Sequence, residues 1–66
     1  MTLFINGESK SIPLMINIVQ LLDHLKIGPD RIAVEVNHKI VRRVEWQTTP
    51  LQDLDKIEIV QFVGGG

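Results

Sequence analysis

The sequence predicts an α+β fold, a mixed sheet of four to five strands with one main helix packed on one face. Three observations support this: an Asn6-Gly7 turn between two apolar runs, an amphipathic helix after residue 17, and a long β-rich stretch at residues 57–63. The order hairpin, helix, strand, short strand, final strand suits the β-grasp arrangement. In that arrangement the first and last strands lie parallel at the centre of the sheet.

The first two strands are expected as a hairpin. Residues 2–5 are apolar and β-favouring, and Asn6-Gly7 is the strongest short-range hairpin signal. The returning strand is expected at residues 10–14, where Ile12 and Leu14 alternate. Because Pro13 cannot donate a hydrogen bond to a ladder, this strand should be an edge strand or end there.

One helix is predicted to follow Asn17. Asn17 and Gln20 have the spacing of a capping box. Gly28-Pro29 is a helix-stop signal. Four apolar residues fall at i, i+3, i+4 and i+7 and form one face: Ile18, Leu21, Leu22 and Leu25. Since these side chains need an apolar cover, the helix is expected to lie on the sheet.

The second half of the chain is read as strands joined by turns. Residues 32–36 alternate as a strand, residues 37–39 form a tight turn, and Ile40-Val41 continue as a short strand. Residues 42–46 are expected as a helical turn or irregular loop, with Trp46 as a core or rim residue. The turn-rich residues that follow lead to the last and longest strand.

Strand alternation predicts an apolar patch on the face of the sheet without the helix. If Leu3 and Ile57 face the helix, then Phe4, Val60 and Phe62 face away from it. With the central strands adjacent, these three side chains would sit together as a docking surface. The alternatives are a loop that covers the patch, or a register changed by one residue at a bulge.

Composition excludes several classes of function. The chain has 66 residues, seven basic and eight acidic residues, a formal net charge of −1, and no cysteine. One domain is therefore expected, without disulfides or thiolate metal sites, and without the basic surface that nucleic acids or membranes require. No segment approaches the ~20 apolar residues of a membrane span. A cytoplasmic protein that is a monomer when free, with no bound metal or cofactor, is expected.

The acidic, basic and histidine side chains form no recognisable active site. Asp53 and Asp55 fit turn residues that bond their own backbone better than an acid–base pair or a metal site. His24 and His38 have no metal-ligand spacing. Arg42 and Arg43 could bind an acidic partner surface or phosphate, although a solvated pair is the simpler interpretation.

The glycine run that ends the sequence is the main candidate functional feature. A β-grasp domain is expected at residues 1–63 and a flexible tail at residues 64–66. Gly64, Gly65 and Gly66 would form a thin arm whose one reactive group is the α-carboxylate of Gly66. Such an arm could enter a channel too narrow for side chains. The alternative is a frayed end without function.

The whole chain resembles the ThiS/MoaD family of sulfur carriers, prokaryotic relatives of ubiquitin, and the ThiS branch in particular. The Asn37…Val41…Arg43…Trp46 spacing points to that branch. Further similar stretches are Phe4-Ile5-Asn6-Gly7, Val19-Gln20-Leu21-Leu22, Ile57-Glu58-Ile59-Val60 and Val63-Gly64-Gly65-Gly66.

The chain departs from the family pattern at two places. It has Val41-Arg42-Arg43 where the family usually reads Val-Pro-Arg, which would alter the partner surface. It has Asp53-Leu54-Asp55 where the family usually reads Asp-Gly-Asp. Leu54 therefore stands where the turn is expected to need a positive φ, which glycine adopts more readily than other residues.

The resemblance implies a protein cosubstrate rather than an enzyme. It implies that a ThiF-like adenylyltransferase uses ATP to join AMP to the Gly66 carboxylate. Sulfur from a cysteine desulfurase or another donor then gives a thiocarboxylate, which donates sulfur to a ThiG-like thiazole synthase. Gly64 and Gly65 would supply clearance and reach. Partner docking would fall to Phe4, Arg43, Val60 and Phe62.

Three other functions stay open from the sequence. The chain could be a MoaD-like carrier for molybdopterin synthesis, although such chains are usually longer. It could be a ubiquitin-like modifier in which Gly66 forms an isopeptide bond with a lysine. It could also be an interaction module whose tail is inert.

Overall fold

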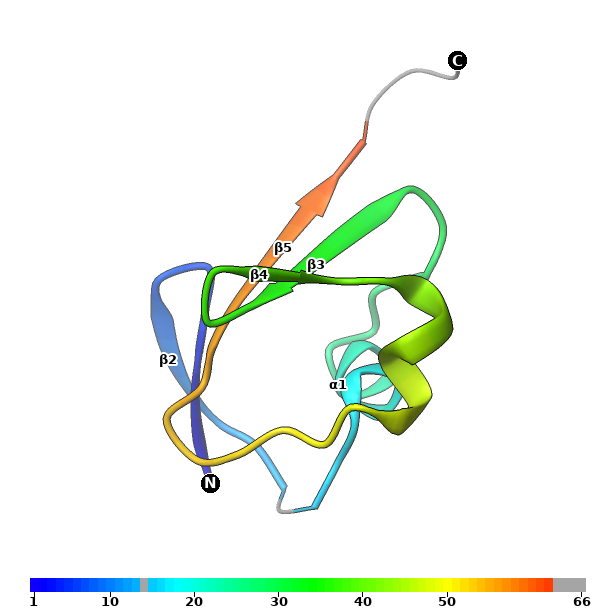
Figure 1. The fold of residues 1–66 in the computed structure, drawn as a ribbon. Helices are drawn as coiled ribbons and strands as arrows, with labels where there is room; N and C mark the ends of the chain where they lie inside the picture. Colours follow the sequence, from blue (N-terminus) through cyan, green and yellow to red (C-terminus); the bar gives the residue numbers. More distant parts are fainter. Residues whose placement is uncertain (14, 63–66) are drawn as a thin grey trace.

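The computed structural model describes residues 1–13 and 15–62, and within them five strands form one mixed sheet (Figure 1). The elements in chain order are β1 (Thr2–Ile5), β2 (Glu8–Ser11), α1 (Ile18–His24), β3 (Ile32–Val36), β4 (Lys39–Val41), the 3₁₀ segment η1 (Arg43–Thr48) and β5 (Lys56–Gln61). The sheet order is β2-β1-β5-β3-β4. β1 and β5 are parallel, and the other neighbours are antiparallel. The predicted α+β, β-grasp fold is confirmed.

The first hairpin has the predicted turn but a different second strand. Asn6 and Gly7 have φ of 50° and 85°, as a two-residue hairpin turn requires. This short turn pairs Ile5 with Glu8, so β2 begins at Glu8 rather than at residue 10. The expected strand at residues 10–14 is therefore wrong in its bounds, because β2 ends at Ser11, before Pro13. Leu14 lies outside the described residues.

The helix begins as predicted and ends earlier. The Asn17 side chain accepts a hydrogen bond from the Gln20 N–H at 2.8 Å, and the Gln20 side chain accepts one from the Asn17 N–H at 2.9 Å. The expected stop at Gly28-Pro29 is wrong. Lys26 takes the left-handed conformation, with φ of 60°, and the Ile27 N–H donates to the Leu22 carbonyl at 2.9 Å. These features form a Schellman-type end without glycine.

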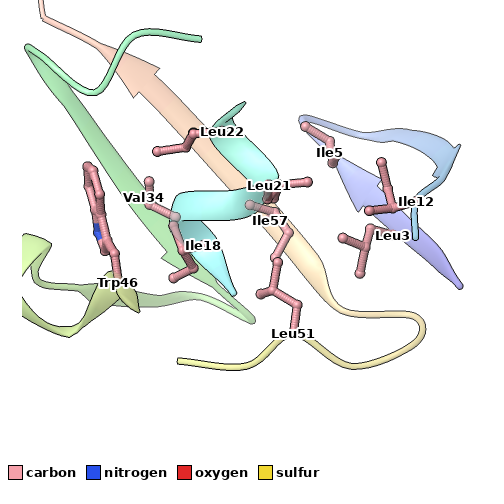
Figure 2. Close-up of a cluster of buried hydrophobic side chains, with 10 residues drawn as sticks. All are labelled: Leu3, Ile5, Ile12, Ile18, Leu21, Leu22, Val34, Trp46, Leu51 and Ile57. Atoms are coloured by element: carbon pink, nitrogen blue, oxygen red, sulfur yellow. The ribbon is translucent and has the colours of Figure 1, made fainter. Parts of the chain in front are cut away.

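The core lies between α1 and the face of the sheet that α1 covers. Figure 2 shows the buried apolar side chains of this core, Leu3, Ile5, Ile12, Ile18, Leu21, Leu22, Val34, Trp46, Leu51 and Ile57. The Trp46 Nε1–H donates to the Val41 carbonyl at 2.9 Å, so its one polar atom is satisfied inside the core. Among the described residues no helix is long and apolar enough to cross a membrane.

The turn before β5 carries the strain that the sequence predicts. Leu54 has φ of 70° and its side chain is 59% exposed, so packing offers little compensation for the left-handed conformation. For a non-glycine residue this conformation costs about 1–2 kcal/mol.

Replacing Leu54 with glycine should therefore stabilise the protein. We expect Leu54→Gly to raise the free energy of unfolding by about 0.5–1 kcal/mol, because relief of the strain exceeds the entropy that glycine loses on folding. Denaturant unfolding measures the change. The matched control is Val44→Gly, at a position 76% exposed in η1 with no positive φ, and it should lower stability. A Leu54→Gly protein less stable than the wild type would contradict the strain.

Candidate functional site

β5 leads into the glycine run and occupies the centre of the sheet (Figure 1). Its start pairs with β1 through Phe4↔Lys56 and Ile5↔Ile57. From Ile57 onward it pairs with β3, from Val36↔Ile57 to Ile32↔Gln61. The predicted tail, residues 64–66, lies outside the described residues together with Val63, and its flexibility stays a prediction. The site is therefore described from the strand that precedes the tail.

Asn6 extends the hydrogen bonding of β5 past the end of β1. Its side-chain oxygen accepts from the Ile59 N–H at 2.7 Å, and its side-chain amide donates to the Ile59 carbonyl at 3.2 Å. These two bonds replace the pair that a further strand residue would make. Ile59 is thus held on the β1 side although β1 has already turned away.

Asn37 extends the hydrogen bonding of β5 on its other edge, the β3 side, at the start of the strand. Its side-chain oxygen accepts from the Lys56 N–H at 3.0 Å, and its own N–H donates to the Lys56 carbonyl at 2.7 Å. Its side-chain amide donates to Asp55 at 3.0 Å. Like Asn6, Asn37 begins a two-residue turn and has positive φ, here 52°. Two turn asparagines therefore fasten β5 from both sides.

The two aspartates before β5 act on the backbone. The Asp53 carboxylate accepts from the Thr2 N–H at 2.7 Å, and the Asp55 carboxylate accepts from the Gln52 N–H at 2.8 Å. The prediction that these residues bond the backbone of their own turn is confirmed for Asp55, whereas Asp53 bonds the backbone of β1 instead. Among the described residues no group of three or more histidine, cysteine or acidic side chains could hold a metal ion.

The face of the sheet opposite α1, called the open face below, carries three of the four predicted docking residues: Phe4, Val60 and Phe62. Leu3 and Ile57 are fully buried against the helix, which confirms the predicted alternation. Val60 and Phe62 are 50% and 54% exposed, whereas Phe4 is partly buried.

The three apolar residues among the predicted docking residues do not form one contiguous patch. The parallel register sets Phe4 beside Lys56, four residues before Val60, which separates them by about 13 Å along the strand. Glu58 lies between them on the same face. The expectation that Phe4, Val60 and Phe62 sit together is therefore wrong for Phe4, and the structure brings only Val60 and Phe62 close together along the chain.

Arg43 lies on the helix side of the molecule, at the start of η1. Its guanidinium is 3.7 Å from the Asp30 carboxylate and 5.8 Å from the centre of the Trp46 ring. Both Arg43 and Asp30 are exposed, and exposed ion pairs contribute little to stability. The structure therefore does not join Arg43 to Val60 and Phe62, and its docking role stays a prediction.

The asparagine contacts can be separated from the turns that contain them. We expect Asn6→Gly and Asn37→Gly each to lower the free energy of unfolding by about 1–2 kcal/mol, because glycine keeps the positive φ while the side-chain hydrogen bonds are lost. Thermal unfolding measures the change. His38→Gly, at the second position of the same kind of turn, is the matched control and should retain stability. If Asn6→Gly is as stable as the wild type, Asn6 does not fasten β5.

The fold and the position of the glycine run define a small β-grasp protein of the ubiquitin-like class. The ThiS family model matches residues 3–66, and the chain belongs to the ThiS family. Proteins of this family are small sulfur carriers of thiamine biosynthesis. The resemblance stated from the sequence is thereby confirmed.

Solved structures support the same assignment. The crystal structure of the thiamine biosynthesis protein ThiS from Geobacter metallireducens matches with a TM-score of 0.87 and 30% identity, and the match covers all of both chains. A solution NMR structure of a thiamine biosynthesis protein from the same organism matches with a TM-score of 0.83 over 88% of its chain.

Sequence relatives are of two kinds. A thiazole synthase of Paramagnetospirillum magneticum is 38% identical over the whole chain, and the match covers 20% of that protein. A thiazole synthase of Magnetococcus marinus is 36% identical over the same share. The chain thus spans about a fifth of these two relatives. An uncharacterized protein, ycf40, of Pyropia yezoensis is 37% identical over 94% of the chain and 87% of its own length.

Proposed function

We propose that this chain carries sulfur as a thiocarboxylate on Gly66 and delivers it for thiazole formation. The observation that supports this most strongly is a ThiS family match over residues 3–66, which include the glycines that follow the central strand. β5 gives those residues a fixed starting point, because both of its edges are hydrogen-bonded. Glycines add no side chains that would block entry to a partner's active site.

Activation would precede sulfur transfer, since a carboxylate is a poor electrophile. In a chain that ends at Gly66, a carboxylate oxygen attacks the α-phosphorus of ATP on a ThiF-like adenylyltransferase and releases pyrophosphate. The terminal sulfur of a persulfide, supplied by a cysteine desulfurase or another donor, then attacks the acyl carbon and expels AMP. A thiol supplies the two electrons that cleave the resulting S–S bond and leave the thiocarboxylate. ATP is consumed in this sequence, and no cofactor stays bound.

A ThiG-like thiazole synthase is the proposed acceptor of the sulfur. Two relatives named thiazole synthase each contain a stretch similar to this chain within one longer polypeptide. This supports a functional association between a chain of this kind and a thiazole synthase. From Phe62, the four residues to Gly66 reach at most about 14 Å. An enzyme that binds Gly66 in its active site must therefore lie close to the end of β5, where Val60 and Phe62 are exposed.

Intact mass spectrometry tests the carrier role. After incubation with the adenylyltransferase, ATP and a persulfide donor, the mass should rise by the difference between one sulfur and one oxygen atom. A chain that lacks Gly66 is the control and should keep its mass and its melting temperature. An unchanged wild-type mass, with partner enzymes shown to be active on another carrier, would refute the proposal. Conjugates of higher mass would indicate a protein modifier instead.

The docking role of Phe62 is tested by a charge at that position. We expect Phe62→Asp to weaken binding to the adenylyltransferase about tenfold or more, because an aromatic side chain at an interface centre contributes on the order of 2 kcal/mol. Titration calorimetry measures the affinity. Val44→Asp, at an exposed position in η1, is the matched control and should bind normally. Equal affinities of Phe62→Asp and the wild type would remove Phe62 from the interface.

A further inference from the structure

Two glutamates stand directly opposite each other in the centre of the open face. The β3–β5 register pairs Glu35 with Glu58. Val34 and Ile57, their neighbours in sequence, are fully buried against the helix, so both carboxylates project to the open face. Like charges at directly opposed positions of a sheet destabilise it. The free protein therefore carries an unfavourable charge pair in its two longest strands.

Neither carboxylate has a basic partner within the described residues. Among the described residues, the ion pair that forms joins Arg43 and Asp30, which lie on the helix side and not on the open face. Lys56 is the nearest basic residue in sequence on the same face, two positions before Glu58. It lies on the far side of Glu58 from Val60 and lines a hollow of about 160 Å³ together with Phe4, Gly7, His38 and Glu58. The charge of the pair is thus not neutralised by a salt bridge.

Exposed apolar side chains surround the charged pair. Ile40 on β4 pairs with Glu35 and is 73% exposed. On the side toward the glycine run, Val60 is half exposed and pairs with Ala33. An apolar surface with a negative centre is complementary to an apolar surface that carries one positive side chain.

We propose that the thiazole synthase places an arginine or lysine side chain between Glu35 and Glu58, with apolar contacts to Ile40, Val60 and Phe62. This inference rests on the proposed function and adds the chemistry of the partner surface. The synthase is the chosen occupant because relatives named thiazole synthase hold a stretch similar to this chain in the same polypeptide. It must also lie beside β5 to receive Gly66, at most about 14 Å from Phe62.

A bound cation would convert the repulsion into two attractive contacts. An arginine can bond both carboxylates at once, because its planar guanidinium presents five N–H donors. The pair thus lowers the stability of the free chain and strengthens the complex. A purely structural role of these residues would not produce this opposite change in stability and binding.

The test compares the wild type with the double variant Glu35→Gln/Glu58→Gln. Affinity for the purified thiazole synthase is measured at about 50 mM and about 300 mM NaCl, which brackets weak and strong screening. We expect the double variant to bind about five- to tenfold more weakly at low salt and to lose most of the salt dependence of the wild type. Its melting temperature should rise by about 1–3 °C.

Controls separate this inference from the proposed function. Glu45→Gln removes one negative charge in η1, on the helix side, and should leave affinity and salt dependence unchanged. If the wild type accepts sulfur but binds the synthase no more tightly than the double variant, this inference alone is overturned. It is also overturned if the double variant weakens binding only to the adenylyltransferase. A wild-type chain that never accepts sulfur overturns the proposed function and the inference with it.

Discussion

The hydrogen bonding of β5 on both of its edges is the constraint on which the rest of the molecule depends. β1 and β3 flank this strand. The pairing of β1 with β5 ends at Ile5↔Ile57, after which β1 turns away, and β3 ends near the point where β5 begins. Asn6 and Asn37 supply the missing bonds at these two places from turns that require positive φ. A strand fixed in this way holds its last residues in a defined direction. A chain of 66 residues has no large core that could do so by packing alone.

The two faces of the sheet differ in how deeply their apolar residues are buried. The α1 face buries Leu3, Val34 and Ile57 completely. The open face keeps Val60 and Phe62 exposed and sets Glu35 against Glu58, although neither feature stabilises the free chain. Natural proteins commonly accept a loss of stability where a surface serves function. The strained Leu54 lies in a turn away from this surface, and no functional reason for it is apparent.

Much of the fold could be predicted from local signals. Asn6-Gly7, the Asn17–Gln20 capping box and the alternation in β5 each depend on residues close in sequence, and the structure has all three. The predicted end of the helix was wrong because Lys26, rather than the glycine of Gly28-Pro29, adopts the left-handed conformation. Propensity alone does not favour lysine there, but Ile27 gains a place against the core when the chain turns at that point.

The features that define the candidate site depend on long-range register. The alternation of side chains in β1 correctly predicted the face of the sheet on which Phe4 lies. It could not predict which β5 residues lie beside Phe4, because the pairing of β1 with β5 decides that. The opposition of Glu35 and Glu58 and the contacts from Asn6 to Ile59 span more than twenty residues and leave no local pattern. Asn37 is the partial exception, since it belongs to the spacing that indicated the ThiS branch.

Hydrogen exchange of the free chain and of its complex with the thiazole synthase measures most directly whether β5 is held on both of its edges. We predict that the Ile59 and Lys56 amides, which the two asparagines bond, exchange as slowly as the buried core in both states. New protection on binding should fall on the open face and on residues 61–66. If the β5 amides exchange rapidly in the free chain, or lose protection in the complex, β5 is not a fixed support for the glycine run.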